Sequence, residues 1–232
     1  STLAEYARRQ VGLPDDAPEG MPPGGFKFIR PPILRGEFHD SDGNSTVAKG
    51  IPLEYQDWLH HTYDAAVATA DEYIGQILEQ LEALDLNDET IILFTSDHGE
   101  ELFEHGLLAH GHSLHEELVR VPLILAGPGI PVGERTDKLV SNRHIAPTLA
   151  KFGGVDLPDV PTPKDLSRPE TWTASPVISS TQQGWWNGSH PLEIFSITTD
   201  EWVLHWAPTG AEWREEPKPD SEGMWRLYNR SN

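Results

Sequence analysis

The chain has 232 residues and a formal net charge of −20, with 37 acidic and 17 basic side chains. This length suffices for one large domain, or one domain plus a small appendage, with a substantial hydrophobic core. The charge argues against nucleic acid or an anionic membrane as a partner, because those surfaces require patches of Lys and Arg.

The cysteine count is zero, so disulfides and thiolate ligands are excluded and any metal must be bound by oxygen and imidazole. No run has the apolar length of a membrane span, and the N-terminus lacks a signal-peptide pattern, which favours a cytoplasmic location. Acidic residues are distributed along the chain and lysine is scarce. This combination indicates a protein adapted to high salt, with an ordinary acidic bacterial protein as the alternative.

The first 52 residues are predicted to be largely loop, because the segment 14–50 is rich in Pro and Gly and has no helical or strand period. Residues 53–84 are the most strongly periodic part of the chain and predict one long helix. Its apolar stripe consists of Leu59, Tyr63, Ala66, Ala70, Ile74, Ile77, Leu81 and Leu84.

Short apolar runs at 91–96 and 121–126 predict central strands buried on both faces. "SLHEELVR" between them predicts a helical turn, "KLVSN" (138–142) predicts a third strand, and "HIAPTLAKFGG" predicts a helix ended by glycine. Helices that alternate with apolar strands indicate an α/β fold with a mostly parallel sheet flanked by helices.

The residue composition and pattern of the chain change after residue 154. Residues 155–174 are predicted to be a proline-rich linker, and the β-prone runs of 175–232 predict a small antiparallel subdomain. Most tryptophans fall in this region. We expect them to be packing residues of the subdomain, with a sugar-stacking or partner surface as the alternative.

The run "TSDHGEELFEHGLLAHGHSLHEE" (95–117) contains five histidines. Asp97 and His98 directly follow a predicted strand, where ligands bind in doubly wound folds. Both side chains can reach one cation if the backbone turns, and Gly99 permits a turn. A carboxylate with an imidazole suits Mn²⁺, Zn²⁺ or Fe better than Mg²⁺ or Ca²⁺. The alternative is an Asp97 helix cap beside an exposed His98.

The order of these motifs resembles the sulfatase family of the alkaline phosphatase superfamily. The likeness runs from about Tyr63, through "TSDHGEE" and "HGHSLHEELVRVPLI", to "SNRHIAPTLAKFGGV", and the overall composition suggests a haloarchaeal member. It implies that residues 1–154 are the C-terminal part of an alkaline-phosphatase-like α/β domain and that 175–232 are the small antiparallel subdomain of those enzymes.

Enzymes of this family cleave sulfate esters, and relatives act on phosphate or phosphonate esters, through a metal-activated nucleophile. The resemblance implies that Asp97 and His98 are metal ligands. Mn²⁺ or Ca²⁺ is the expected cofactor, with Mg²⁺ or Zn²⁺ possible. Typical sulfatases have Asn where this chain has His98, which is similar to the phosphonate and phosphate branch and favours Mn²⁺.

The family commonly has a lysine that contacts the substrate anion and protonates the leaving oxygen. Here His110 or His112 stands in that region, and the sequence leaves the register open. His105 and His115 are expected to be structural, and His144 stands where the family more often has aspartate and is expected to pack or cap.

The nucleophile motif of the family, Cys-x-Pro-x-Arg or Ser-x-Pro-x-Arg, which yields formylglycine, does not occur in the chain. We therefore expect the second half of an active site, with the N-terminal half of the same fold as its partner and a small sulfate or phosphate ester as substrate. Hydrolysis or transfer of a phosphate or phosphonate ester is one alternative. A non-catalytic fragment or degenerate module is the other, and the oligomeric state cannot be read from the sequence.

Overall fold

The structure is a computed structural model that describes residues 37–39, 45–47, 53–105, 108–111, 113–155, 157, 164–183, 192–207 and 224–230. The chain forms two compact units. The first consists of Ser1–Leu86 and Glu101–Ala109, and the second of Asn87–Glu100 and His110–Asn232. The limits of these two units differ from the domain boundaries predicted from the sequence, which are 1–154, 155–174 and 175–232. Those boundaries stay a prediction.

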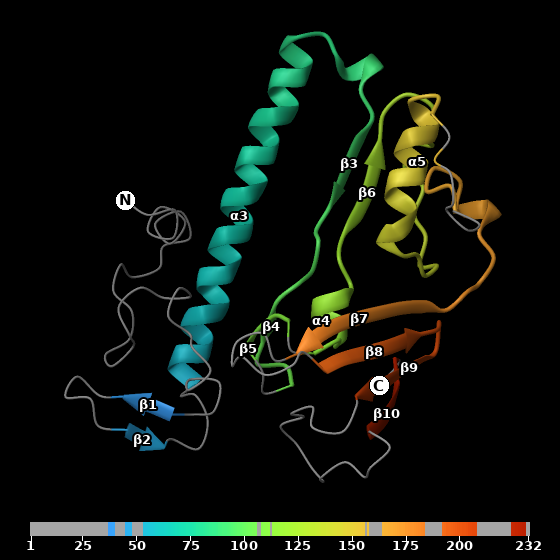
Figure 1. Ribbon diagram of the computed structural model, residues 1–232. Coiled ribbons are helices and arrows are strands. Elements are labelled where there is room, and N and C mark those ends of the chain that lie inside the picture. The colour runs from blue at the N-terminus through green and yellow to red at the C-terminus, as the bar shows by residue number, and fades with distance from the viewer. Residues whose placement is uncertain are drawn as a thin grey trace. The chain divides into compact units, whose positions relative to one another are not determined.

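The first unit is dominated by helix α3, Leu53–Ala83, which confirms the helix predicted at 53–84 (Figure 1). Two short strands, β1 (Glu37–His39) and β2 (Ser45–Val47), pair in antiparallel fashion inside the region predicted as largely loop. Apart from these strands, the predicted loop 1–52 lies outside the described residues.

The buried face of α3 differs from the predicted apolar stripe. Its buried residues are Trp58, Leu59, Thr62, Ala65 and Thr69. The two threonine hydroxyls donate to carbonyl oxygens four residues earlier, each at 2.8 Å, so they can be buried without losing a hydrogen bond. A count of apolar residues alone therefore misplaced the face by about one position.

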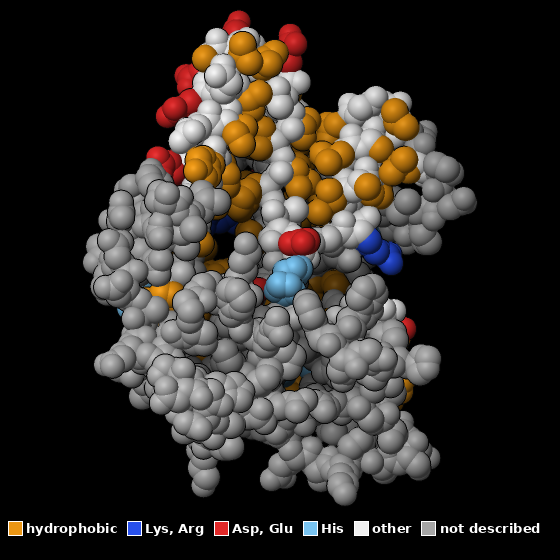
Figure 2. All heavy atoms as spheres, turned by 60° about the vertical axis from the view of Figure 1, so that its left-hand side comes forward, with side chains coloured by type: hydrophobic (Ala, Val, Ile, Leu, Met, Phe, Trp, Pro, Cys, Tyr) orange, Lys and Arg blue, Asp and Glu red, His pale blue; other side chains and the backbone are white. Residues whose placement is uncertain are grey.

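The core of the first unit forms where Trp58 and Leu59 pack against Leu102 of strand β4 (Glu101–Leu102). This strand pairs with β5, Leu108–Ala109. The apolar side chains in the later turns of α3 stay exposed, with Ile77 at 62% and Leu84 at 58%. Figure 2 shows hydrophobic and acidic side chains together along this exposed helix.

In the second unit, the 3-10 turn η2 (Asn87–Glu89) leads into strand β3 (Ile92–Thr95), which pairs with β6 (Leu123–Ala126). Both strands were predicted, but their pairing is antiparallel, so the expectation of a parallel sheet is wrong for this pair. Burial on both faces is also wrong, because Phe94 and Ile124 are 38% and 58% exposed. An apolar run in the sequence indicates a strand. It specifies neither the direction of the neighbouring strand nor which faces of the strand are buried by other elements.

Helix α5, Ile145–Phe152, follows the turn η3 (Asn142–His144), as Figure 1 shows. It confirms the helix predicted from "HIAPTLAKFGG". The segment 138–142, predicted to be a strand, enters no strand pairing in the described part of the chain.

The last part of the second unit is a four-stranded antiparallel sheet. Its strands follow one another along the sheet in chain order: β7 (Val177–Gln183), β8 (Leu192–Thr198), β9 (Trp202–Ala207) and β10 (Met224–Asn229). A short 3-10 turn η4, Pro169–Thr171, precedes it. Ile194 and Ala207 on one face are buried with Leu114, next to helix α4 (Glu116–Val119).

Helix α5 is anchored to the following segment through its first turn. His144 is buried, and its Nδ1 accepts a hydrogen bond from the backbone N–H of Lys164 at 3.1 Å. Thr148 Oγ1 donates to the His144 carbonyl at 2.8 Å and accepts from the N–H of Leu166 at 3.1 Å. His144 is therefore a packing residue, and its side chain makes no helix-cap hydrogen bond.

The pKa of His144 should make stability depend on pH. Burial lowers this pKa first, and the nearby charges of Arg143 and Lys164 lower it further. The folded protein therefore binds fewer protons than the unfolded chain, and stability is lost as pH falls below about 6.5. We expect the free energy of unfolding to decrease between about pH 7.5 and pH 5.5, and His144→Asn, which keeps an acceptor but does not titrate, to weaken that decrease. Equal pH dependence in the two proteins, measured by denaturant titration, would refute this origin.

Candidate active site

The candidate site begins at the turn that leaves β3. His98 N–H donates to Asp97 Oδ1 at 3.0 Å, and Ser96 Oγ donates to the His98 carbonyl at 2.7 Å. The backbone N–H of His98 is the main cause that lowers the pKa of Asp97, and the electrostatic effect of the neighbouring His98 side chain adds to it. Asp97 is exposed and is held ready as a carboxylate, the form in which it can bind a cation.

The His98 ring is held in one tautomer. Its Nδ1 lies 2.8 Å from the Gly99 carbonyl oxygen, which can only accept, so Nδ1 carries the proton and Nε2 carries the lone pair. Metal-binding histidines commonly donate their second N–H to a backbone carbonyl in this way. Nε2 lies 3.7 Å from Asp97 Oδ2, a separation that two ligand atoms can have when each is about 2.1 Å from one cation. The pair thus fits a shared divalent metal.

Gly99 is needed in this turn, although not for the reason the sequence suggested. Its backbone does not use the left-handed region. A Cβ at this position would overlap the Glu117 carbonyl oxygen, and the Gly99 N–H donates to the Leu118 carbonyl at 2.9 Å. The site turn therefore lies directly on the backbone of α4, and any side chain at position 99 would push the two apart.

A second pair of groups lies next to His98. His110 Nδ1 is 2.8 Å from Glu100 Oε2, and the rings of His98 and His110 have centroids 4.1 Å apart. His98, Glu100 and His110 each offer a ligand atom within 4.8 Å of the other two. The structure thus brings His110 to the metal pair and adds Glu100, which the sequence interpretation missed. Its only signal was the acidic residue that ends the motif "SDHGE".

The other three histidines of the run are His105, His112 and His115. His112 falls outside the described residues. His115 is buried between α4 and the C-terminal sheet. Its ring centroid lies 5.9 Å from that of Tyr228 and 5.2 Å from that of His205. It has the packing environment expected of a structural residue. His105 is exposed and belongs to the first unit.

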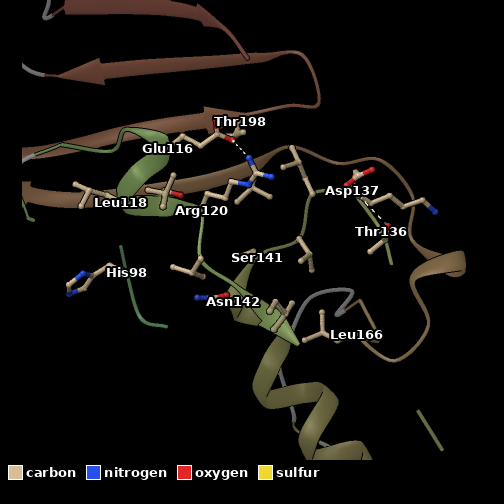
Figure 3. A pocket seen from close by; sticks show the side chains of 18 of the residues that line it. His98, Glu116, Leu118, Arg120, Thr136, Asp137, Ser141, Asn142, Leu166 and Thr198 are labelled. Atoms are coloured by element: carbon tan, nitrogen blue, oxygen red, sulfur yellow. Dashed lines mark hydrogen bonds and ion pairs between the residues drawn. The ribbon is translucent and has the colours of Figure 1, made fainter. Parts of the chain in front are cut away.

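Asp97, His98 and His110 line a cavity of about 1640 Å³ in the second unit. Figure 3 shows His98 among its lining residues. Asn142 also lines it and donates to the Ser96 carbonyl at 3.4 Å, at the end of β3. The cavity exceeds the range of about 300–1,000 Å³ typical of small-molecule pockets. A compact ligand at His98 would therefore fill only a corner of it.

Among the described residues, four basic side chains line the cavity, and they differ in how far other groups already bind them. Arg230 is bound to Glu116 at 2.7 Å and to the Thr199 carbonyl at 3.1 Å, and Lys138 donates to two backbone carbonyls. Arg120 lies 3.8 Å from Glu116 and is mostly exposed. Arg135 makes no ion pair with the described residues, so Arg120 and Arg135 are the cations most free to meet an anion.

The family model described as Sulfatase matches residues 34–155, just over half of the chain, so the chain belongs to the sulfatase family. It is 40% identical over 96 residues to arylsulfatase K of Mus musculus, covering 41% of this chain and 17% of that protein. It is also 40% identical over 98 residues to the choline-sulfatase of Rhizobium meliloti (strain 1021), covering 42% and 19%. The matches thus span less than a fifth of the length of these relatives.

Solved structures agree with this assignment. BT4656, solved in complex with its substrate D-glucosamine-2-N,6-O-disulfate, superposes with a TM-score of 0.61 at 26% identity, over 79% of this chain and 36% of its own. BT1596, a 2-O GAG sulfatase, gives a TM-score of 0.64 at 17% identity, over 99% of this chain and 50% of its own. The fold is therefore the alkaline-phosphatase-like α/β fold of sulfatases. In the described part of the chain, no helix has the length and apolar character to span a membrane.

Enzymes of this family use a divalent metal, and the described residues contain one group that could hold it, His98, Glu100 and His110. Asp97 Oδ2 lies 3.7 Å from His98 Nε2 and is a fourth possible ligand. The chain has no cysteine, so a metal here must take oxygen and imidazole ligands, and these four side chains supply them.

Gly99→Ala tests the close contact beneath the site. The added Cβ must displace the α4 backbone, so we expect a loss of stability of about 1–3 kcal/mol. Gly75→Ala is the matched control, because a Cβ there meets nothing within 4 Å in the middle of α3 and should stabilise by about 0.5–1 kcal/mol. Thermal and denaturant unfolding of both variants gives the answer. Equal stability of Gly99→Ala and the parent chain would mean that the turn is not packed on α4.

Proposed function

We propose that this chain carries the metal-binding part of the active site of a sulfuric ester hydrolase. The observation that supports it most directly is the placement of Asp97 Oδ2 and His98 Nε2, 3.7 Å apart at the end of β3, in a member of the sulfatase family. Both side chains line a cavity, where a small ester could reach them. The family and its relatives make sulfate the first choice of ester.

Asp97 and His98 are the proposed ligands of a divalent cation. The lowered pKa of Asp97 keeps its carboxylate charged, and the bond from Nδ1 to Gly99 keeps the His98 Nε2 lone pair available. When bound, such a cation withdraws charge from the ester oxygens and lowers the pKa of the nucleophile. Mn²⁺ fits this mixed set best, and Ca²⁺, Mg²⁺ and Zn²⁺ are the alternatives.

His110 is the proposed general acid and substrate-anion contact, with His112 as the second candidate of the sequence interpretation. The Glu100 carboxylate is hydrogen-bonded to Nδ1 of His110. The Glu100 side chain is largely buried, whereas the His110 side chain is about half exposed to solvent. This hydrogen bond fixes the ring, and Nε2 is the atom proposed to carry a proton toward the ester. As the bond between sulfur and the ester oxygen breaks, Nε2 would give its proton to that oxygen.

The nucleophile is proposed to lie outside these 232 residues, because the sequence contains neither Cys-x-Pro-x-Arg nor Ser-x-Pro-x-Arg. On this reading, the chain contributes two ligands and an acid to a site that the N-terminal half of the same fold completes. Two ligands bind a labile cation weakly, so tight metal binding requires that second half.

The proposed substrate is a small-molecule sulfate ester. Relatives include a choline-sulfatase and the N-acetylglucosamine-6-O-sulfatase of Bacteroides thetaiotaomicron, which is 38% identical over 109 residues. The guanidinium of Arg135 lines the cavity, makes no ion pair with the residues that the structure describes, and could meet a second negative group of such a substrate.

Hydrolysis or transfer of a phosphate or phosphonate ester is the second candidate. His98 follows Asp97 where typical sulfatases have Asn, and the fold is similar to a phosphonate monoester hydrolase from Silicibacter pomeroyi, with a TM-score of 0.63 at 18% identity. That likeness concerns the fold alone. A scaffold without catalytic activity is the remaining alternative, and the test below separates all three.

The test uses the protein in the full length that its gene encodes, assayed with 4-nitrophenyl sulfate and with a phenylphosphonate monoester. We expect sulfate hydrolysis to be the faster reaction, and His98→Ala and Asp97→Ala to lose metal and activity together. Glu100→Gln should keep the metal and lower kcat by about 100-fold, because it removes the group that orients His110. Metal content is measured by mass spectrometry.

Each contrary result has a distinct meaning. Faster cleavage of the phosphonate would favour the second candidate, and no cleavage of either ester by a metal-loaded protein would favour the inert scaffold. Metal loss in Glu100→Gln would move the site to His98, Glu100 and His110. Retention of metal in His98→Ala would refute the ligand assignment altogether.

A further inference from the structure

Arg230, which follows β10, connects three elements of the second unit. Its Nη2 lies 2.7 Å from Glu116 Oε1 at the start of α4, and its side chain is only 19% exposed. Its Nη1 donates to the carbonyl oxygens of Thr199 at 3.1 Å and Asp200 at 3.4 Å, in the turn between β8 and β9. Its backbone N–H donates to the Glu201 carbonyl at 2.9 Å. The planar guanidinium thus holds α4 to the β8–β9 turn in one geometry.

Glu116 has a second cation close to it. Arg120, at the C-terminal end of α4, lies 3.8 Å from the same carboxylate oxygen, and its side chain is 75% exposed. Figure 3 shows both side chains in this part of the chain. An exposed ion pair within one helix contributes little and cannot fix that helix against another element. The ion pair with Arg230 is therefore the one that ties Glu116 to the C-terminal sheet.

Helix α4 in turn sets the backbone of the site turn. The Leu118 carbonyl accepts the N–H of Gly99 at 2.9 Å, and the Glu117 carbonyl oxygen lies where a Cβ of Gly99 would be. The Gly99 carbonyl oxygen lies 2.8 Å from His98 Nδ1 and selects the tautomer of that ring. A rotation of α4 would therefore move Gly99 and weaken the hydrogen bond that keeps the Nε2 lone pair available.

Apolar contacts also hold α4, but in a less specific way. Leu114 and Val119 pack against Ile194 and Ala207 of the sheet. Apolar packing has no preferred direction, whereas a hydrogen bond from a guanidinium to a carboxylate does. Loss of the Arg230 side chain should therefore leave α4 on the sheet and allow it to rotate there.

We propose that Arg230 is a positioning residue of the candidate active site. Its ion pair with Glu116 holds α4 in the orientation in which Gly99 fixes the tautomer of His98. The use of the Nε2 lone pair for metal binding rests on the proposed function, whereas the link from Arg230 to the His98 tautomer does not.

The first test measures the His98 tautomer in the metal-free, gene-encoded protein. Long-range ¹H–¹⁵N NMR at about pH 8, where imidazole is neutral, distinguishes the two ring nitrogens, and His98→Ala assigns the signals. We expect the Nδ1–H tautomer in the parent protein and a mixture of both tautomers in Arg230→Gln, with an unchanged circular dichroism spectrum. Lys151→Met is the matched control, because it removes a 2.8 Å ion pair with Asp165 in the same unit and should leave the tautomer unchanged.

The second test titrates the same proteins with Mn²⁺ alone and follows free Mn²⁺ by electron paramagnetic resonance. We expect Arg230→Gln and Glu116→Gln each to weaken Mn²⁺ binding about 5-fold, and the double variant to weaken it no further, because both changes break one contact. Lys151→Met should bind Mn²⁺ as the parent protein does. Glu116→Gln carries both tests if Arg230→Gln does not fold.

The outcomes separate this proposal from the proposed function. An unchanged His98 tautomer in a folded Arg230→Gln or Glu116→Gln protein overturns the proposal, as does an equal change in Lys151→Met. Additive losses of Mn²⁺ affinity in the double variant also overturn it, because the two residues would then act separately. A tautomer that changes in a protein whose parent binds no Mn²⁺ would support the positioning role and contradict the proposed function.

Discussion

The contact between the Gly99 backbone and the backbone of α4 is the constraint on which the site depends. The Glu117 carbonyl oxygen takes the space that a Cβ would occupy, and the Gly99 N–H is bonded to Leu118. This contact fixes the direction in which the chain leaves β3, and therefore where Asp97 and His98 stand. The same residue orients the His98 ring, because its carbonyl accepts the Nδ1 proton.

Helix α4 is itself held by the C-terminal sheet. Arg230 reaches from the end of β10 to Glu116 at 2.7 Å, and His115 packs against Tyr228 and His205. Leu114 and Val119 close the contact against Ile194 and Ala207. A residue far along the sequence thus supports the turn that carries the proposed metal ligands, through α4 as the common support. The sheet is therefore part of the site's scaffold.

Local sequence patterns predicted the elements well and their arrangement poorly. The positions of α3, β3, β6 and α5 followed from apolar spacing and from Pro and Gly signals. The antiparallel pairing of β3 with β6 did not, because strand direction is set by contacts distant in sequence. The buried face of α3 was misplaced because Thr62 and Thr69 satisfy their hydroxyls within the helix, which an apolar count ignores.

The candidate site shows the same division. Asp97, His98 and His110 could be named from their motif, but the role of Gly99 could not, since it depends on the approach of Glu117. Glu100 was missed because its partner His110 is ten residues away and only the fold brings them to 2.8 Å. Charge and residue type indicate the chemistry of a site. Which side-chain atoms come together in that site depends on tertiary contacts.

The central claim is that His98 contributes one imidazole nitrogen, Nε2, to a cation that Asp97 also binds. Pulsed electron paramagnetic resonance of the gene-encoded protein loaded with Mn²⁺ counts imidazole nitrogens directly. Labelling histidine with ¹⁵N and substituting His98 or His110 in turn assigns each signal. We expect coupling from His98 that disappears in His98→Ala and is unchanged in His110→Ala. Coupling from both histidines, or from neither, would contradict the account.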